Sequence, residues 1–220
     1  MKRTEILSDG IRIIQDDALY TFTSDAILLS KFASVKKGEA VADFCAGCGV
    51  VGFNLYALNA DKISSLTFFE LQPELFSLCE ENIRLNGKSG EFKAVLGRVQ
   101  DLPKEFYGKF SLIICNPPYM KNGAGEKNLS ENIAACRAEV FLTLEELIKA
   151  AASGLKFGGR FCVVHRADRL ADLISLMRRY NIEPKRLMPV AARGKAPYLI
   201  LVEGVKGGKS GLKFLKTVYN

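Results

Sequence analysis

The tetrapeptide Asn116-Pro117-Pro118-Tyr119 is the part of this sequence with the most specific chemistry. It ends an apolar run, and its two prolines hold the backbone rigid. The Asn116 side-chain oxygen and the Pro117 carbonyl would then point in fixed directions, from which both can accept hydrogen bonds from one amino group. Such acceptors favour a pyramidal nitrogen with an available lone pair, and Tyr119 offers a flat face on which a ring can stack. The alternative is an ordinary turn whose tyrosine packs on the surface.

A second segment, 43–49, combines a carboxylate with closely spaced glycines in the sequence D-F-C-A-G-C-G. Gly47 and Gly49 let the backbone turn tightly and approach a ligand, and the helix that follows would direct free N–H groups at it. Glu70 lies about 20 residues further on, where a carboxylate suits a ribose hydroxyl. These residues indicate an adenosine-containing cofactor, either NAD or S-adenosylmethionine, with a ligand-free turn as the alternative. Asp43 favours S-adenosylmethionine, because a carboxylate repels pyrophosphate and attracts amino and sulfonium cations.

The elements that would position these two segments alternate between strands and helices. The expected strands are Ala40–Cys45, Ser65–Glu70, Phe92–Leu96, Ser111–Asn116, Arg160–His165 and Tyr198–Glu203. The expected helices are Val51–Asn59, Pro73–Asn86, Val140–Gly154 and Asp168–Tyr180. This alternation predicts a parallel sheet with helices on both faces, whose strand C-termini share the ligand-binding edge. Residues 1–220 are expected to form a single α/β domain, with 1–36 as an N-terminal cap segment and 37–220 as the core.

Composition narrows the class of protein. Hydrophobic residues make up 48% of the chain and charged residues 25%, as in an ordinary enzyme. No apolar run reaches the roughly 18 residues of a membrane span, and no signal core is recognised, so a cytoplasmic protein without a membrane partner is expected. Three of the six cysteines lie in or at the ends of apolar runs, which indicates a reducing compartment. The pair Cys45-x-x-Cys48 has no second pair to complete a zinc site, and no metal is expected.

The net charge of +7 is unevenly distributed. The chain carries +9 from Arg160 to its end and −2 before that residue. A basic C-terminal third is typical of a flank that binds a polyanion, although a basic surface that only maintains solubility has the same pattern.

The order of the two motifs resembles that of Rossmann-like (class I) methyltransferases that act on adenine, guanine or glutamine amines. The chain is especially similar to the bacterial tRNA(Val) adenine-37 N(6)-methyltransferase family, almost end to end. The resemblance is carried by residues 22–29, by Arg137-x-Glu139 before 142–147, by Val164-His165-Arg166 and by Asp168-Arg169-Leu170. One departure is Ala138, which stands where a histidine is usual.

This resemblance implies a mostly parallel seven-stranded sheet, S-adenosyl-L-methionine as cofactor and tRNA as partner, with the oligomeric state open and a monomer favoured. It implies catalytic roles for Asn116, Pro117 and Tyr119. The implied cofactor-binding residues are Asp25, Asp43, Gly47, Gly49, Glu70 and Asp101.

In the family, the acid corresponding to Asp101 recognises the cofactor's adenine amine, although as an alternative Asp101 only caps a turn. Asp25 lies in segment 22–29, which resembles the family's N-terminal segment that folds over the cofactor's methionine end. His165 is expected to be structural or RNA-facing, and 121–128 to form a loop over the active site.

Several other functions remain open. The same chemistry would serve methylation of a release-factor glutamine or of guanine in ribosomal RNA. Methylation of adenine in DNA, and an RNA-binding protein that has lost its cofactor, are further alternatives. An NAD-dependent oxidoreductase would share the glycine turn but leaves Asn116 to Tyr119 without a role.

Overall fold

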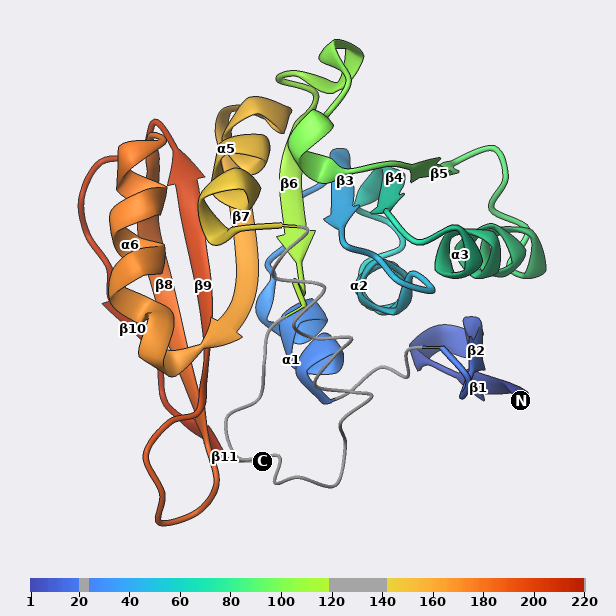
Figure 1. The fold of residues 1–220 in the computed structure, drawn as a ribbon, viewed down its shortest axis with the longest axis horizontal. Coiled ribbons are helices and arrows are strands. Elements are labelled where there is room, and N and C mark those ends of the chain that lie inside the picture. Colours follow the sequence, from blue (N-terminus) through green and yellow to red (C-terminus); the bar gives the residue numbers. More distant parts are fainter. Residues whose placement is uncertain (20–23, 119–141, 220) are drawn as a thin grey trace.

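The computed structural model describes residues 1–19, 24–118 and 142–219. In these residues, nine strands form one sheet in the order β10-β8-β9-β7-β6-β3-β4-β5, with β11 also pairing with β8 (Figure 1). The seven longer strands are β3 (Glu39–Phe44), β4 (Ile63–Glu70), β5 (Phe92–Leu96), β6 (Phe110–Cys115), β7 (Leu155–Arg166), β8 (Ile182–Ala191) and β9 (Leu199–Lys206). The short strands are β10 (Lys213–Phe214) and β11 (Val218–Tyr219). Of the described strands in this sheet, only β9 runs antiparallel to its neighbours, which confirms the predicted mostly parallel sheet.

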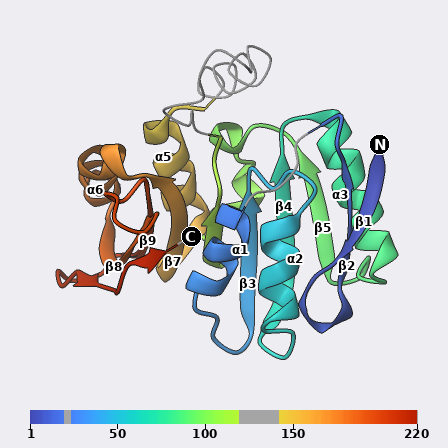
Figure 2. The ribbon, with the colours of Figure 1, turned by 90° about the horizontal axis from the view of Figure 1, so that it is seen from below.

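Helices cover both faces of the sheet. One face carries α1 (Ser24–Phe32), α2 (Val50–Ala57) and α3 (Pro73–Leu85), and the other carries α5 (Leu144–Gly154) and α6 (Leu170–Arg179). Figure 2 shows α1 and α2 side by side over β3 and β4. Each face has its own core because side chains alternate along a strand. In β3, Val41 belongs to the first core, and Ala42 and Phe44 belong to the second.

Short turns and a hairpin complete the described fold. The 3-10 turns are η1 (Ser8–Gly10), η2 (Val99–Asp101), η3 (Lys104–Phe106) and η4 (Ala167–Arg169). The first strands, β1 (Lys2–Ile6) and β2 (Arg12–Asp16), pair with each other and lie against α3 rather than in the main sheet. Of the helices described, none is long and apolar enough to cross a membrane.

All six expected strands are present, within a few residues of their expected bounds or extended beyond them, but β8 and the N-terminal hairpin were not expected from the sequence. Pro184 and Pro189 interrupt the pattern of β8, since proline cannot donate a backbone hydrogen bond. The strand accommodates them because only β9 pairs with it along most of its length. The hairpin was missed because its burial comes from α3 and not from a regular apolar pattern.

A buried ion pair fixes α1 at the edge where the parallel strands begin. The Arg160 guanidinium on β7 pairs with Glu39 on β3, and both side chains are almost fully buried. The same guanidinium donates to the Ser34 carbonyl at 2.6 Å and to the Ser34 Oγ at 2.8 Å. Because Ser34 lies two residues after Phe32, the last residue of α1, these bonds anchor that helix to two strands of the sheet.

Candidate active site

The sheet brings the two predicted motifs together. Phe44 on β3 lies opposite Cys115 on β6 and opposite Phe69 on β4. Asn116 directly follows Cys115, and Glu70 directly follows Phe69. The two side chains and the glycine turn after β3 therefore lie at the C-terminal ends of three neighbouring strands, each about 4.8 Å from the next.

The Asp43 carboxyl is completely buried at the end of β3. Its Oδ2 accepts a hydrogen bond from the Gly52 N–H at 2.8 Å, whereas Oδ1 has no hydrogen-bond partner among the described residues. Burial raises the pKa of Asp43 to about 8; the Gly52 bond opposes this shift and the nearby Glu70 charge adds to it. A buried oxygen without a hydrogen-bond partner destabilises the fold unless a ligand supplies a donor. A cationic ligand group would also offset the cost of burying the negative charge of Asp43.

The glycines of the turn have different local roles. Gly49 has a φ of +91°, and a Cβ there would lie 2.9 Å from the Phe53 ring. A Cβ at Gly52 would lie 2.6 Å from the Phe68 ring, so this glycine lets α2 pack closely on the sheet. Gly47 has a φ of +58°, but a Cβ there would meet nothing within 4 Å. Open space at Gly47 leaves the turn accessible to a ligand.

Glu70 holds this turn from the neighbouring strand. Its Oε2 accepts from the Gly47 N–H at 2.7 Å, and its Oε1 accepts from the N–H groups of Leu71 and Gln72 at 2.9 Å each. Burial raises the pKa of Glu70, against the effect of these three bonds. Because a carboxylate oxygen can accept two hydrogen bonds, Oε2 still has one acceptor position for a ligand hydroxyl.

The Asn116 turn presents two acceptors beside this acid site. The Asn116 side chain is half-buried and makes no hydrogen bond within the described part of the chain. Pro117 is buried and Pro118 is exposed, so the turn spans the boundary between core and solvent. Tyr119 and the expected loop 121–128 lie outside the described residues.

Two further predicted residues occupy different environments. Asp25 is buried in the first turn of α1, which is joined to α2 by the 2.6 Å bond from Asn54 Nδ2 to Ser30 Oγ. Asp101 ends η2, with 70% of its side chain exposed and one oxygen 3.7 Å from Arg98 Nε. Its turn follows β5 and so lies at the same edge of the sheet. The roles assigned to both acids remain predictions.

One positioning residue was missed from the sequence. Asn82 on α3 is completely buried; its Nδ2 donates to the carbonyls of Cys48 at 2.9 Å and Ile14 at 3.1 Å. Its Oδ1 accepts from the Ile14 N–H at 2.8 Å. The side chain therefore ties the glycine turn to the N-terminal hairpin. The available signal was an asparagine in the apolar stripe of its helix, between Cys79 and Ile83.

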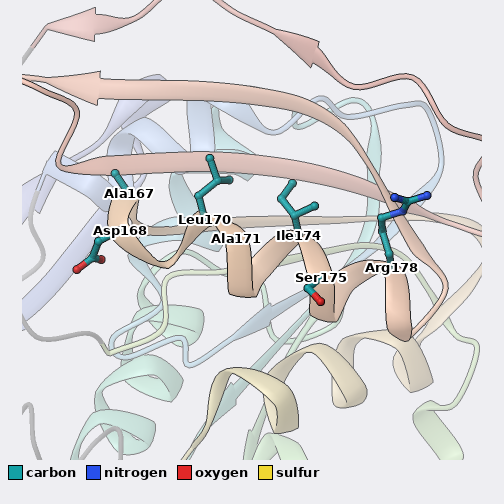
Figure 3. Close-up of a pocket in the computed structure, with 7 residues that line it drawn as sticks. All are labelled: Ala167, Asp168, Leu170, Ala171, Ile174, Ser175 and Arg178. Atoms are coloured by element: carbon teal, nitrogen blue, oxygen red, sulfur yellow. The ribbon is translucent and has the colours of Figure 1, made fainter.

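Two other features lie apart from this site. Over the described ranges, no group of three or more His, Cys, Asp or Glu side chains could hold a metal ion. An open groove runs along α6 from the end of β7 and contains none of the predicted site residues (Figure 3). The groove is lined by Ala167, Asp168, Leu170, Ala171, Ile174, Ser175 and Arg178.

Known proteins are similar to this chain in sequence. One relative, a tRNA1(Val) (adenine(37)-N6)-methyltransferase from Shewanella sp. (strain W3-18-1), is 27% identical over 163 residues, which cover 73% of this chain and 66% of the relative. A protein of the same name from Actinobacillus pleuropneumoniae serotype 5b is 28% identical over 63% of this chain and 56% of its own length. The chain thus matches less than two thirds of the length of these relatives.

Solved structures agree with this fold. A predicted O-methyltransferase from Agrobacterium tumefaciens has a TM-score of 0.69 at 20% identity, covering 89% of this chain and 86% of that one. The TYW2 protein from M. jannaschii, in complex with AdoMet, has a TM-score of 0.64 at 15% identity, covering 92% of this chain and 84% of that one.

The model of the methyltransferase small domain matches residues 23–179, which is well over half of the sequence. The predicted methyltransferase class is therefore confirmed, and the chain belongs to the methyltransferase small domain family.

Proposed function

We propose that this chain is an S-adenosylmethionine-dependent methyltransferase that methylates the exocyclic amine of adenine in tRNA. The observation that carries this proposal is the position of the Asn116 turn and the buried acid site at the ends of the paired strands β6 and β3. The names of the relatives support adenine in tRNA as the substrate. The AdoMet complex among the structural neighbours supports the cofactor.

The residues at the glycine turn fit this cofactor. Asp43 Oδ1, which is buried and has no partner among the described residues, suits the cationic amino and sulfonium end, and the open acceptor position on Glu70 Oε2 suits a ribose hydroxyl. The space at Gly47 leaves room for the ligand beside the backbone. When bound, S-adenosylmethionine supplies an electrophilic methyl group on a positively charged sulfur. Asp25 and Asp101 are proposed to contact its methionine and adenine ends.

The Asn116 turn would position the amine that accepts this methyl group. Conjugation with the ring delocalises the lone pair of an exocyclic amine and makes it a poor nucleophile. If Asn116 Oδ1 and the Pro117 carbonyl accept its two N–H groups, the nitrogen becomes pyramidal and its lone pair can point along the line of transfer. The same oxygens stabilise the positive charge that develops on the nitrogen. The new N–C bond would be balanced by cleavage of the S–CH3 bond, whose electron pair stays on the sulfur of S-adenosylhomocysteine, and one amine proton would be lost to solvent.

The experiment that tests this function is mass spectrometry of tRNA nucleosides from cells with and without the gene. We expect N6-methyladenosine to disappear from one tRNA in the deleted strain, and to return when the purified chain and S-adenosylmethionine are added. An unchanged nucleoside profile would exclude tRNA as the substrate. Labelled transfer to guanine in ribosomal RNA or to a release-factor glutamine would identify the alternative substrates. Because tRNA functions in the cytoplasm, we propose that compartment for the protein.

A further inference from the structure

The loop that joins β8 to β9, residues 192–198, lies at the same edge of the sheet as the candidate active site. Strands β7 and β8 both run antiparallel to β9, so their C-terminal ends share one edge. Residue Leu199, directly after the loop, lies opposite both Arg166 and Val190. In Figure 1 the loop extends beyond the ends of these strands, on the side toward which β6 and β7 point.

The loop carries two cationic side chains that no described carboxylate neutralises. Arg193 and Lys195 are exposed, and neither forms an ion pair in the described part of the molecule. Nearby, Arg166 and Arg169 are paired with the carboxylates of Asp168 and Asp172. Among the described residues, Arg193 and Lys195 therefore contribute charge that is not paired at this edge.

Two exposed tyrosines lie at this loop, Tyr198 as its last residue and Tyr219 beside its start. Tyr198 is 44% exposed, and its backbone is held by bonds from its N–H to the Val190 carbonyl at 3.0 Å and from the Ala167 N–H to its own carbonyl at 3.1 Å. Tyr219 on β11 pairs with Ala191 beside the start of the loop and is 61% exposed. Aromatic faces beside free cations match the requirements of an unpaired nucleic-acid strand, in which bases stack and phosphates need neutralising.

We propose that Arg193, Lys195, Tyr198 and Tyr219 form a docking surface for the single-stranded RNA that flanks the target base. This inference rests on the proposed function and names the surface that holds its substrate. Strand β9 is two strand spacings, about 10 Å, from β6, so a strand whose target base enters at Asn116 can reach the loop within a few nucleotides. Arg193 and Lys195 bind phosphates, and Tyr198 stacks on a neighbouring base.

The test measures binding of unmodified tRNA by fluorescence anisotropy at several salt concentrations. The double variant R193A/K195A should raise the Kd about tenfold and lower the slope of log Kd against log salt by about two, one for each lost phosphate contact. The control K109A/K156A removes the same charge from two exposed lysines, Lys109 directly before Phe110 and Lys156 directly after Leu155, where β6 and β7 begin at the opposite edge of the sheet. It should bind tRNA like the wild type.

The variants of Tyr198 separate ring stacking from charge. Tyr198→Ala should weaken tRNA binding about tenfold, while Tyr198→Phe, which keeps the ring, should stay within about twofold of the wild type. All variants should bind S-adenosylhomocysteine with unchanged affinity. The docking surface alone would be overturned if R193A/K195A bound tRNA with the affinity and salt slope of the wild type. It would also be overturned if K109A/K156A weakened tRNA binding as much as R193A/K195A does. A wild-type chain that binds S-adenosylhomocysteine but no tRNA would overturn the proposed substrate as well.

Discussion

The Gly52 N–H and Asp43 Oδ2 form a 2.8 Å hydrogen bond that joins the first turn of α2 to the end of β3. The other carboxyl oxygen, Oδ1, is buried and unpartnered within the described residues, and the pKa of Asp43 is about 8. An unfolded aspartate ionises near pH 4. Folding therefore takes up a proton between about pH 4 and pH 8, and this contribution to stability is complete below pH 4 and is lost as the pH rises through 8.

Cofactor binding should release a proton from this carboxyl. The ammonium group of the ligand's amino acid end, placed beside Asp43, stabilises the ionised form, so the affinity for S-adenosylhomocysteine should rise from pH 6 to pH 8 and level off above the pKa of Asp43. Calorimetry at pH 7 in buffers of different ionisation enthalpy would count the released proton. Asp43→Asn should bind more weakly and without proton release. A wild-type protein that binds with no proton release would contradict this role for the carboxyl.

Gly47 and Gly87 offer a matched pair of substitutions. Both have left-handed φ angles, +58° and +64°, and a Cβ at either position would meet nothing within 4 Å. Alanine at either position should therefore lower the free energy of unfolding, measured with urea, by about 1 kcal/mol. Only Gly47→Ala should also reduce the affinity for S-adenosylhomocysteine, because only this Cβ enters the proposed cofactor space. Equal affinities in the two variants would show that no ligand occupies that space.

Asn82 should be important for both stability and cofactor binding. Asn82→Ala removes the three hydrogen bonds of a fully buried amide and leaves the Cys48 carbonyl without that donor. We expect a loss of about 2–4 kcal/mol in urea unfolding and weaker cofactor binding. Asn86→Ala, which removes a more exposed amide that bonds Arg12 of the same hairpin, should cost less and leave cofactor affinity unchanged. If Asn82→Ala bound the cofactor normally, Asn82 would have no role in positioning the turn.

Because the pair of Glu39 and Arg160 is buried, removing its negative charge should lower the free energy of unfolding far more than the same change in an exposed pair. Glu39→Gln leaves the guanidinium buried beside an uncharged side chain and should cost about 3–5 kcal/mol of unfolding free energy. Glu91→Gln, in the exposed pair with Lys88, should change stability by no more than about 0.5 kcal/mol. Urea titrations would compare the two. Similar small effects would show that the buried pair contributes little to anchoring α1.

The sequence was sufficient to predict the elements that follow simple periodic patterns. Strands β3, β4 and β6 carry apolar runs that end at Asp43, Glu70 and Asn116, and parallel topology places such ends together. The position of the loop 192–198 depends on β8, whose prolines conceal it in the sequence. The role of Asn82 depends on a contact with Ile14, 68 residues away in the chain. In the local sequence, the only sign of such long-range hydrogen bonds is a polar residue within an apolar stripe.

In the proposed mechanism, the Asn116 turn positions an amine for a methyl group held at the Asp43 site. Single-turnover transfer of labelled methyl from S-adenosylmethionine to unmodified tRNA, compared between the wild type and Asn116→Ala, tests this claim most directly. We predict that the variant binds S-adenosylhomocysteine and tRNA normally but transfers methyl at least about 100-fold more slowly, as expected when one group that stabilises transition-state charge is removed. Transfer at the wild-type rate by Asn116→Ala would contradict it.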